Sequence, residues 1–115
     1  MREGEDGLEG KVAIVAGGGA RGDGIGNGRA AAILFGRARA KVVVVDRDLA
    51  LARRTEEMIR AEGGEATAVS GDVTAEADCR AIVEAAKEAY GGVDILDNNV
   101  GIGSNKSVVD EDPAF

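Results

Sequence analysis

The sequence predicts an α/β fold with three layers, in which helices cover both faces of a doubly wound parallel sheet. The first observation is that short apolar segments, typical of strands buried on both faces, alternate with longer segments of helix-forming residues. The second is that only short connections separate these segments. Strands joined by helices in this order form a parallel sheet with right-handed crossovers.

A glycine-rich segment separates the first strand from the first helix. Residues 11–16 (KVAIVA) form a nearly continuous apolar run, which predicts a buried strand. Seven of the fourteen residues 15–28 are glycine. Residues 29–40 (RAAAILFGRARA) are rich in helix formers, although Gly36 weakens a helix by about 1 kcal/mol relative to alanine. The glycines therefore join a strand to a helix and do not link two independent units.

The second strand and helix come next. Residues 41–46 (KVVVVD) hold four consecutive valines and end on an acid, which predicts another buried strand. We expect Asp48 to cap the following helix and Gly63-Gly64 to end it. The apolar residues of this helix include Leu51, Met58 and Ile59.

A third strand, a third helix and a fourth strand follow. Residues 66–71 (ATAVSG) predict the third strand, and Thr74 is a candidate cap for the helix after it. The apolar positions of that helix recur at i, i+3, i+4, i+7 and i+11, at Cys79, Ile82, Val83, Ala86 and Tyr90. Gly91-Gly92 ends the helix, and residues 93–96 (VDIL) predict the fourth strand.

Composition excludes several classes of protein. A chain of 115 residues forms one domain at most, and its net charge of −7 disfavours nucleic acid or an anionic membrane as partner. The sequence has no apolar run of membrane-spanning length and no signal-peptide pattern. With one cysteine and no histidine it forms no internal disulfide and no Cys/His metal site. We therefore expect a cytoplasmic protein.

The glycine segment has the position of a phosphate-binding loop. Glycines there let a pyrophosphate approach backbone N–H groups at the positive end of a helix dipole, although such turns also serve packing alone. Asp46 ends the second strand 20 residues after Gly26, the interval at which an acid binds the ribose hydroxyls of a dinucleotide. A carboxylate there repels a 2′-phosphate, so NAD is favoured over NADP. Arg21 and Arg47 pair with a phosphate or are ordinary surface arginines, and the sequence leaves both interpretations open.

Over residues 8–112 the chain resembles the N-terminal, cofactor-binding half of a short-chain dehydrogenase/reductase. Four matches carry the resemblance: the loop Gly17…Gly24-Ile25-Gly26, the acid Asp46, the pair Asp72-Val73, and the motif NNVG at 98–101. The resemblance implies a Rossmann-like sheet in the order 3-2-1-4, truncated after about four strands. We expect a flexible leader at 1–9, an NAD-binding half-domain at 10–103 and an irregular tail at 104–115.

The cofactor-binding residues that these arguments predict come from the loop and from the ends of the strands. They are Gly17, Arg21, Gly24, Ile25, Gly26, Asp46, Arg47, Asp72, Val73, Asn99, Val100 and Gly101.

Three features depart from the family pattern. Ala16 stands where the family has a threonine whose hydroxyl steadies the loop, and the spacing from Gly17 to Gly24 is longer than usual. Asp97 occupies a position that is neutral in most members. Each departure weakens the expected affinity for NAD.

The family's catalytic groups have no counterpart in this chain. The resemblance implies hydride transfer between a nicotinamide and a carbonyl or alcohol, with a Tyr-x-x-x-Lys pair and a serine as catalytic groups. Tyr90 is the only tyrosine, and the residue four positions later is Asp94. Ser104 and Ser107 follow the NNVG motif too closely to match the serine. We expect no catalytic residue, and no activity from the chain alone.

The uncovered edge of the fourth strand suggests association with another polypeptide. We expect either a homo-oligomer or a complementing C-terminal half to bind there. An alternative is a free-standing nucleotide-binding or assembly module without catalysis. A Rossmann-like methyltransferase fragment is a weaker alternative, because such domains carry an acid where this chain has Val15 and a proline-aromatic motif in place of NNVG.

Overall fold

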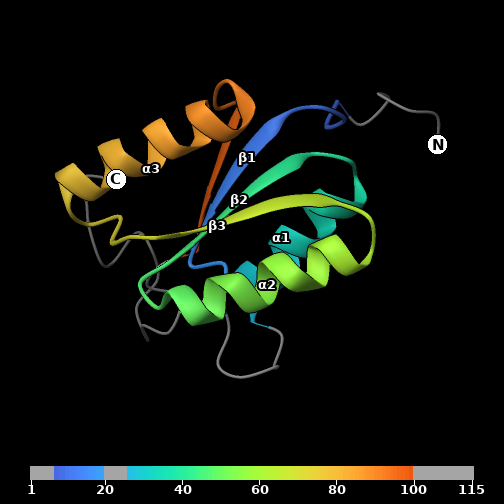
Figure 1. Cartoon of the computed structure of the whole chain (residues 1–115), viewed down its shortest axis with the longest axis horizontal. Coiled ribbons are helices and arrows are strands. Elements are labelled where there is room, and N and C mark those ends of the chain that lie inside the picture. The colour runs from blue at the N-terminus through green and yellow to red at the C-terminus, as the bar shows by residue number, and fades with distance from the viewer. Residues whose placement is uncertain (1–6, 20–25, 100–115) are drawn as a thin grey trace, which may run out of the picture.

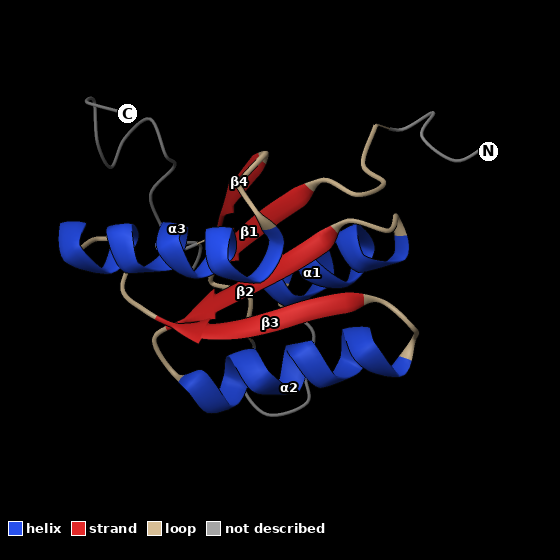
Figure 2. Cartoon of the chain, turned by 45° about the horizontal axis from the view of Figure 1, so that its top comes forward, coloured by secondary structure: helices blue, strands red, loops and turns tan. Residues whose placement is uncertain are grey.

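Four parallel strands form one sheet in the order β3-β2-β1-β4 in the computed structural model, which describes residues 7–19 and 26–99 (Figure 1). Along the chain the elements are β1 (Val12–Ala16), α1 (Asn27–Arg37), β2 (Lys41–Asp46), α2 (Leu49–Ala61), β3 (Glu65–Ser70), α3 (Glu76–Tyr90) and β4 (Ile95–Asn98). Helices α1 and α2 lie on one face of the sheet and α3 on the other (Figure 2). The predicted fold class and strand order are therefore confirmed.

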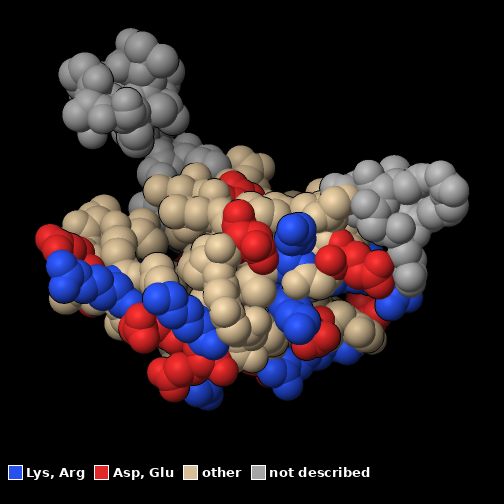
Figure 3. Space-filling model, turned by 90° about the horizontal axis from the view of Figure 1, so that it is seen from above, with Lys and Arg blue, Asp and Glu red and all other residues tan. Residues whose placement is uncertain are grey.

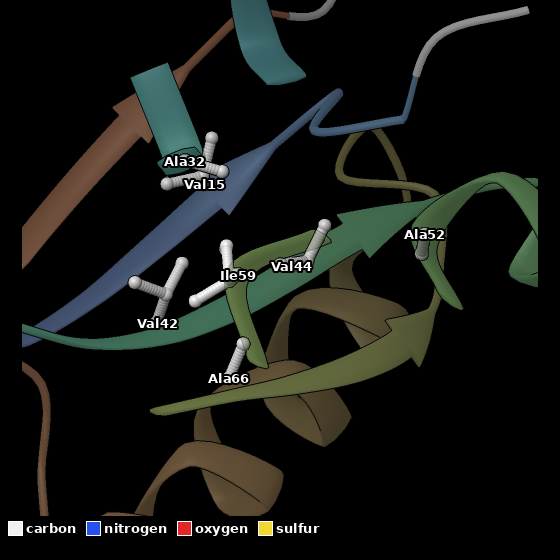
Figure 4. Close-up of a cluster of buried hydrophobic side chains, with 7 residues drawn as sticks. All are labelled: Val15, Ala32, Val42, Val44, Ala52, Ile59 and Ala66. Atoms are coloured by element: carbon white, nitrogen blue, oxygen red, sulfur yellow. The ribbon is translucent and has the colours of Figure 1, made fainter. Parts of the chain in front are cut away.

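The core lies on both faces of β1 and β2, whose apolar residues are fully buried. One apolar cluster fills the space between the sheet and helices α1 and α2. Its members are Val15, Ala32, Val42, Val44, Ala52, Ile59 and Ala66 (Figure 4). The second cluster lies under α3 and consists of Val12, Ile14, Val43, Val45, Ile82 and Ala86. Valine runs that are buried on both faces explain why these strands show no alternation in sequence.

Gly36 lies where α1 meets α2. A Cβ atom added at this position would lie 2.8 Å from Cγ2 of Ile59, closer than real Cβ atoms approach. The glycine therefore lowers the intrinsic stability of α1 but permits close packing of the two helices.

Two of the predicted helix ends are confirmed. The Asp48 carboxylate accepts a hydrogen bond of 3.0 Å from the Ala50 N–H and caps α2. Gly91 has a φ of +89° and ends α3 in the left-handed conformation, which glycine adopts at little cost.

The prediction that Thr74 caps α3 is wrong. The N-cap position is Ala75, which supplies no side-chain hydrogen bond. The Thr74 hydroxyl instead donates to Oδ1 of Asp72 at 2.6 Å. The threonine therefore belongs to a turn before the helix, and the first helical turn carries Glu76 and Asp78 as acids that complement the dipole.

The fourth strand is shifted by two residues from its predicted range, from 93–96 to Ile95–Asn98. Asp94 explains the shift, because both its backbone and its side chain bind the start of β1. Its N–H donates to the Val12 carbonyl at 2.9 Å, and its carboxylate accepts the Val12 N–H at 2.9 Å. The ladder therefore starts after Asp94, with Ala13 opposite Ile95.

No helix within 7–19 and 26–99 is both long and apolar enough to cross a membrane. On the face seen in Figure 3, acidic and basic side chains are interspersed with uncharged surface.

Candidate functional site

A cleft of about 310 Å³ lies at the carboxyl ends of the first three strands. Parallel pairing brings these ends to one side of the sheet, although the residues are far apart in the sequence. The cleft is lined by Gly17, Val45, Asp46, Arg47, Gly71, Asp72 and Val73. Five of the twelve predicted cofactor-binding residues are among them: Gly17, Asp46, Arg47, Asp72 and Val73.

The other predicted residues do not line this cleft or cannot be placed. Gly26 is the N-cap of α1, and Asn99 follows β4 with its N–H bound to the Ala16 carbonyl at 2.9 Å. The remaining five lie outside the described residues: Arg21, Gly24, Ile25, Val100 and Gly101.

The backbone after β1 is held tightly against β2 and α1. The N–H groups of Gly17 and Gly18 both donate to the Val45 carbonyl, at 2.8 and 3.0 Å. A Cβ atom added at Gly28 would lie 1.8 Å from the Gly17 oxygen. Only glycine at position 28 lets the first turn of α1 approach the end of β1 this closely. The sequence analysis did not single out Gly28, although the last glycine before the alanine-rich helix was a possible signal.

Asp46 faces the cleft with capacity to accept further hydrogen bonds. Its Oδ2 accepts the Gly19 N–H at 3.2 Å and its Oδ1 accepts the Asp48 N–H at 3.0 Å. An ionised carboxylate has about four acceptor positions. Two positions therefore remain for hydroxyl donors of a ligand, and the two backbone bonds fix the orientation of the carboxylate.

Asp72 also lines the cleft, and hydrogen bonds from neighbouring residues hold its carboxylate in place. Hydrogen bonds from the hydroxyl and the N–H of Thr74 lower the pKa of Asp72 below its ordinary value, and Arg47 lowers this pKa further. The Arg47 guanidinium lies 3.1 Å from Oδ2 of Asp72 and is largely exposed. Arg47 is therefore ion-paired with Asp72, although most of its side chain is exposed.

The start of α1 differs from the starts of the other two helices. Gly26 supplies no capping side chain, and the first turn of α1 carries no acid. By contrast, Asp48 caps α2, and the first turn of α3 has two acids. The first N–H groups of α1 thus have no capping side chain and no neutralising acid within the helix. Such a helix start attracts an anion.

A buried polar network supports the glycine segment from behind. The Thr55 hydroxyl of α2 donates to the Gly18 carbonyl at 2.8 Å and accepts from Nε of Arg29 at 2.7 Å. Both side chains are fully buried, and Arg29 also donates to the Leu51 carbonyl. This hydroxyl steadies the segment in the absence of a threonine at position 16. The sequence analysis missed the network, although a threonine between the apolar positions of α2 was a signal.

Tyr90 lies away from the cleft. It packs on the α3 face of the sheet, its hydroxyl is 3.0 Å from the Thr67 hydroxyl, and Lys41 at the start of β2 lies 6.0 Å from its ring centre. The cleft is at the other end of β2, beside Asp46. The geometry therefore gives Tyr90 a packing role.

The sequence and the structure both match known oxidoreductases. Residues 11–114 match the short chain dehydrogenase family. An uncharacterized oxidoreductase of Thermotoga maritima is 43% identical over 101 residues, which are 88% of this chain and 38% of that protein. The 7alpha-hydroxysteroid dehydrogenase of Escherichia coli K12 is 40% identical over 99 residues, which are 86% of this chain and 37% of that protein.

Solved structures of short-chain dehydrogenase/reductases also match this chain. A crystal structure from Burkholderia xenovorans, assigned to the short-chain dehydrogenase/reductases, superposes with a TM-score of 0.78 and 47% identity. The match covers 93% of this chain and 41% of that one. This chain thus spans about two fifths of the length of the relatives that it matches. The family uses the nicotinamide cofactors NAD and NADP, and by sequence and fold this chain belongs to the short-chain dehydrogenase family.

Proposed function

We propose that the chain binds the adenosine and pyrophosphate portion of NAD in the cleft at the ends of β1, β2 and β3. The observation that carries the proposal is the position of Asp46, which lines the cleft beside Gly17 and keeps acceptor positions for two hydroxyls. The cleft volume is at the lower end of the range of about 300–1,000 Å³ that small-molecule sites occupy.

Each part of the ligand has a matching group. The ribose hydroxyls donate to Asp46, and the adenine lies against Val73 and the Arg47–Asp72 ion pair. The pyrophosphate lies at the start of α1, which lacks a capping side chain. The loop residues Arg21, Gly24 and Ile25 and the motif residues Asn99, Val100 and Gly101 are part of this proposal as further ligand contacts.

The charges in the cleft support a preference for NAD over NADP. The Asp46 carboxylate would lie against the additional 2′-phosphate of NADP, and two negative charges in contact repel each other. Arg47 is the cation that could offset the repulsion, but its guanidinium is paired with Asp72.

The activity that we propose for the whole protein is hydride transfer between the nicotinamide and a carbonyl or alcohol substrate. This chain contributes the cofactor site and no catalytic residue, since Tyr90 is its only tyrosine and has no lysine four positions later. We propose that the chain by itself is inactive. The single cysteine favours a reducing, cytoplasmic location for this activity.

The test is a calorimetric titration of the purified chain with NADH, NADPH and S-adenosylmethionine. We expect NADH to bind with a Kd on the order of hundreds of micromolar to millimolar, at least about tenfold more tightly than the other two ligands. Asp46→Asn should weaken NADH binding. It should also reduce the ratio by which the chain binds NADH more tightly than NADPH. Glu88→Gln removes the same charge from an exposed position on α3 and should change neither.

Two outcomes would contradict the proposal. One is equal affinity of the folded chain for NADH and NADPH. The other is an Asp46→Asn variant that binds NADH as tightly as the parent chain. Preferential binding of S-adenosylmethionine would favour the methyltransferase alternative.

A further inference from the structure

The first turn of α1 contains an asparagine followed by a glycine. Asn27 is the first residue of the helix and Gly28 is the second. The chain has four asparagines, at positions 27, 98, 99 and 105, and only Asn27 precedes a glycine. The backbone nitrogen of a residue can attack the side-chain amide of an asparagine before it, and glycine hinders this attack least because it has no Cβ. Ring closure is therefore sterically easiest at this pair.

The two residues of the pair differ in their surroundings. Asn27 is exposed to water, whereas Gly28 is buried. The backbone of Gly28 lies so close to Gly17 that an added Cβ atom would be 1.8 Å from the Gly17 oxygen. Water thus reaches the Asn27 amide directly, while any change in backbone length between Asn27 and Gly28 acts on a closely packed contact.

The position of the pair in the helix leaves the Gly28 N–H without an intrahelical acceptor. The N–H of Ala30 donates to the Gly26 carbonyl at 2.9 Å and is the first of the helical bonds. Inside a helix, the N–H that follows an asparagine is bonded to a carbonyl one turn earlier, which holds the backbone in place. The Asn27–Gly28 pair does not have this restraint.

The start of α1 also has little local support. Gly26 supplies no capping side chain, and the first turn carries no acid. By contrast, the Asp48 side chain caps α2, and Glu76 and Asp78 lie in the first turn of α3. Helix ends that lack such groups open more readily than capped ones. Local opening of the first turn of α1 therefore gives the Gly28 nitrogen access to the Asn27 side chain.

We propose that Asn27–Gly28 is a site of spontaneous deamidation. The Gly28 nitrogen loses its proton and attacks Cγ of Asn27, the Cγ–Nδ2 bond breaks, and ammonia leaves. Water then opens the resulting five-membered succinimide ring. Attack of water at Cγ restores the main chain and gives aspartate at position 27. Attack at the backbone carbonyl gives isoaspartate, in which the main chain runs through Cγ.

Both products change the start of α1. Isoaspartate adds one carbon to the backbone before Gly28, so the close contact with Gly17 cannot be kept. Aspartate keeps the backbone but adds a negative charge to the first turn. The effect of this charge on NADH rests on the proposed function, because it would oppose the pyrophosphate at the start of α1. The loss of stability from isoaspartate does not depend on nucleotide binding.

A bound nucleotide should slow the reaction. Phosphate oxygens at a helix start accept hydrogen bonds from the first N–H groups. An N–H that is held in this way does not readily lose its proton, so the Gly28 nitrogen becomes a poorer nucleophile. Because the attack needs a deprotonated nitrogen, the rate should also rise with pH.

Site-resolved mass spectrometry of the full chain during incubation at mildly alkaline pH tests the proposal. Circular dichroism checks that the chain stays folded. We expect Asn27 to be converted at least about tenfold faster than the asparagines at positions 98, 99 and 105. Saturating NADH should slow this conversion several-fold. Asn27→Gln is the matched control, because it keeps the amide but requires a larger ring, and it should stay unmodified.

The effect of the added charge is measured separately. Freshly prepared Asn27→Asp should unfold at the same urea concentration as the parent chain or a higher one, because an acid suits a helix start. It should bind NADH about tenfold more weakly. The fraction that contains isoaspartate should unfold at a lower urea concentration than the unmodified chain.

Three results would overturn the proposal. The first is conversion of Asn27 no faster than that of the other three asparagines. The second is an isoaspartate fraction as stable as the unmodified chain. The third is unchanged conversion of Asn27 in a chain that has bound NADH. If Asn27 is converted as expected but no form of the chain binds NADH, the modification site is supported and the proposed function fails.

Discussion

The two ends of the sheet differ in how completely their groups are satisfied. At the β3 end, α2 packs against the strand, Arg60 binds a strand carbonyl, and the cleft residues are joined by hydrogen bonds and an ion pair. At the other end β4 has four residues and, among the described residues, lies beside exposed apolar side chains, with Leu96 of the strand itself 65% exposed. The comparison teaches that the adenosine part of the proposed nucleotide site lies where more of the polar groups are hydrogen-bonded within the chain. We call the β3 side of the sheet the complete end and the β4 side the open end.

Gly28→Ala should cause a large loss of stability at the complete end. A Cβ at this position would lie 1.8 Å from the backbone oxygen of Gly17, so β1 and α1 must separate. We expect the free energy of unfolding to fall by about 3 kcal/mol, measured by urea denaturation. Gly92→Ala is the matched control, because a Cβ there meets nothing within 4 Å. Equal stability of the two variants would contradict the close contact between Gly28 and the Gly17 backbone.

A smaller loss is expected from Thr55→Val, which keeps the shape of the side chain but removes its hydroxyl. The Gly18 carbonyl loses its donor and Nε of Arg29 loses its acceptor, both in a buried setting. We expect a loss of about 2 kcal/mol and weaker NADH binding. Thr67→Val, which removes a half-buried hydroxyl bound to Tyr90, controls for the loss of a hydrogen bond far from the loop. It should leave NADH affinity unchanged.

At the open end, Leu96→Asp should cost little stability under conditions where the chain is monomeric. The side chain is 65% exposed, so the change in the free energy of unfolding should stay below about 1 kcal/mol. Ile59→Ala removes a fully buried side chain at the complete end and should cost about 2–5 kcal/mol. If Leu96→Asp and Ile59→Ala lowered the free energy of unfolding by similar amounts, the two ends of the sheet would not differ in how much their side chains stabilise the fold.

The smallest effect concerns pH. Hydrogen bonds from Thr74 hold the pKa of Asp72 below its ordinary value of 3.8, and Arg47 adds to this lowering. The stabilising effect of the ionised carboxylate is therefore complete above the unfolded-state pKa and is lost as pH falls through the lower folded-state pKa. Thr74→Val should raise the pKa of Asp72 more than Arg47→Gln does, as measured by carboxyl carbon NMR. The reverse order would show that the ion pair dominates.

The sequence predicted those structural features that depend on neighbouring residues, and it failed where residues distant in the sequence interact. The buried strands, the Asp48 cap and the Gly91 helix end follow from local composition, whereas the strand order was predicted from the resemblance to the family. The start of β4 was misplaced because Asp94 binds Val12, 82 positions away. Threonine often caps helices, but the hydroxyl of Thr74 donates its hydrogen bond to the Asp72 carboxylate instead of capping α3.

The candidate site shows the same limit. Asp46 could be predicted because it ends a strand that the valine run identifies, and Asp72 and Val73 were predicted from the resemblance to the family. The contact of Gly28 with Gly17, and the network of Arg29 and Thr55, depend on how two helices pack behind the loop. No spacing in the sequence encodes those distances.

The most direct test of the central claim is an NMR titration of the ¹⁵N-labelled chain with NADH. If the adenosine part of the nucleotide binds at the complete end of the sheet, the amide signals of Gly17, Gly18, Gly71, Asp72 and Val73 should shift with increasing NADH. The signals of Ile95 and Leu96 should stay unchanged at a protein concentration where the chain is monomeric. Shifts confined to β4, or no shifts in a chain whose spectrum shows it to be folded, would contradict the account.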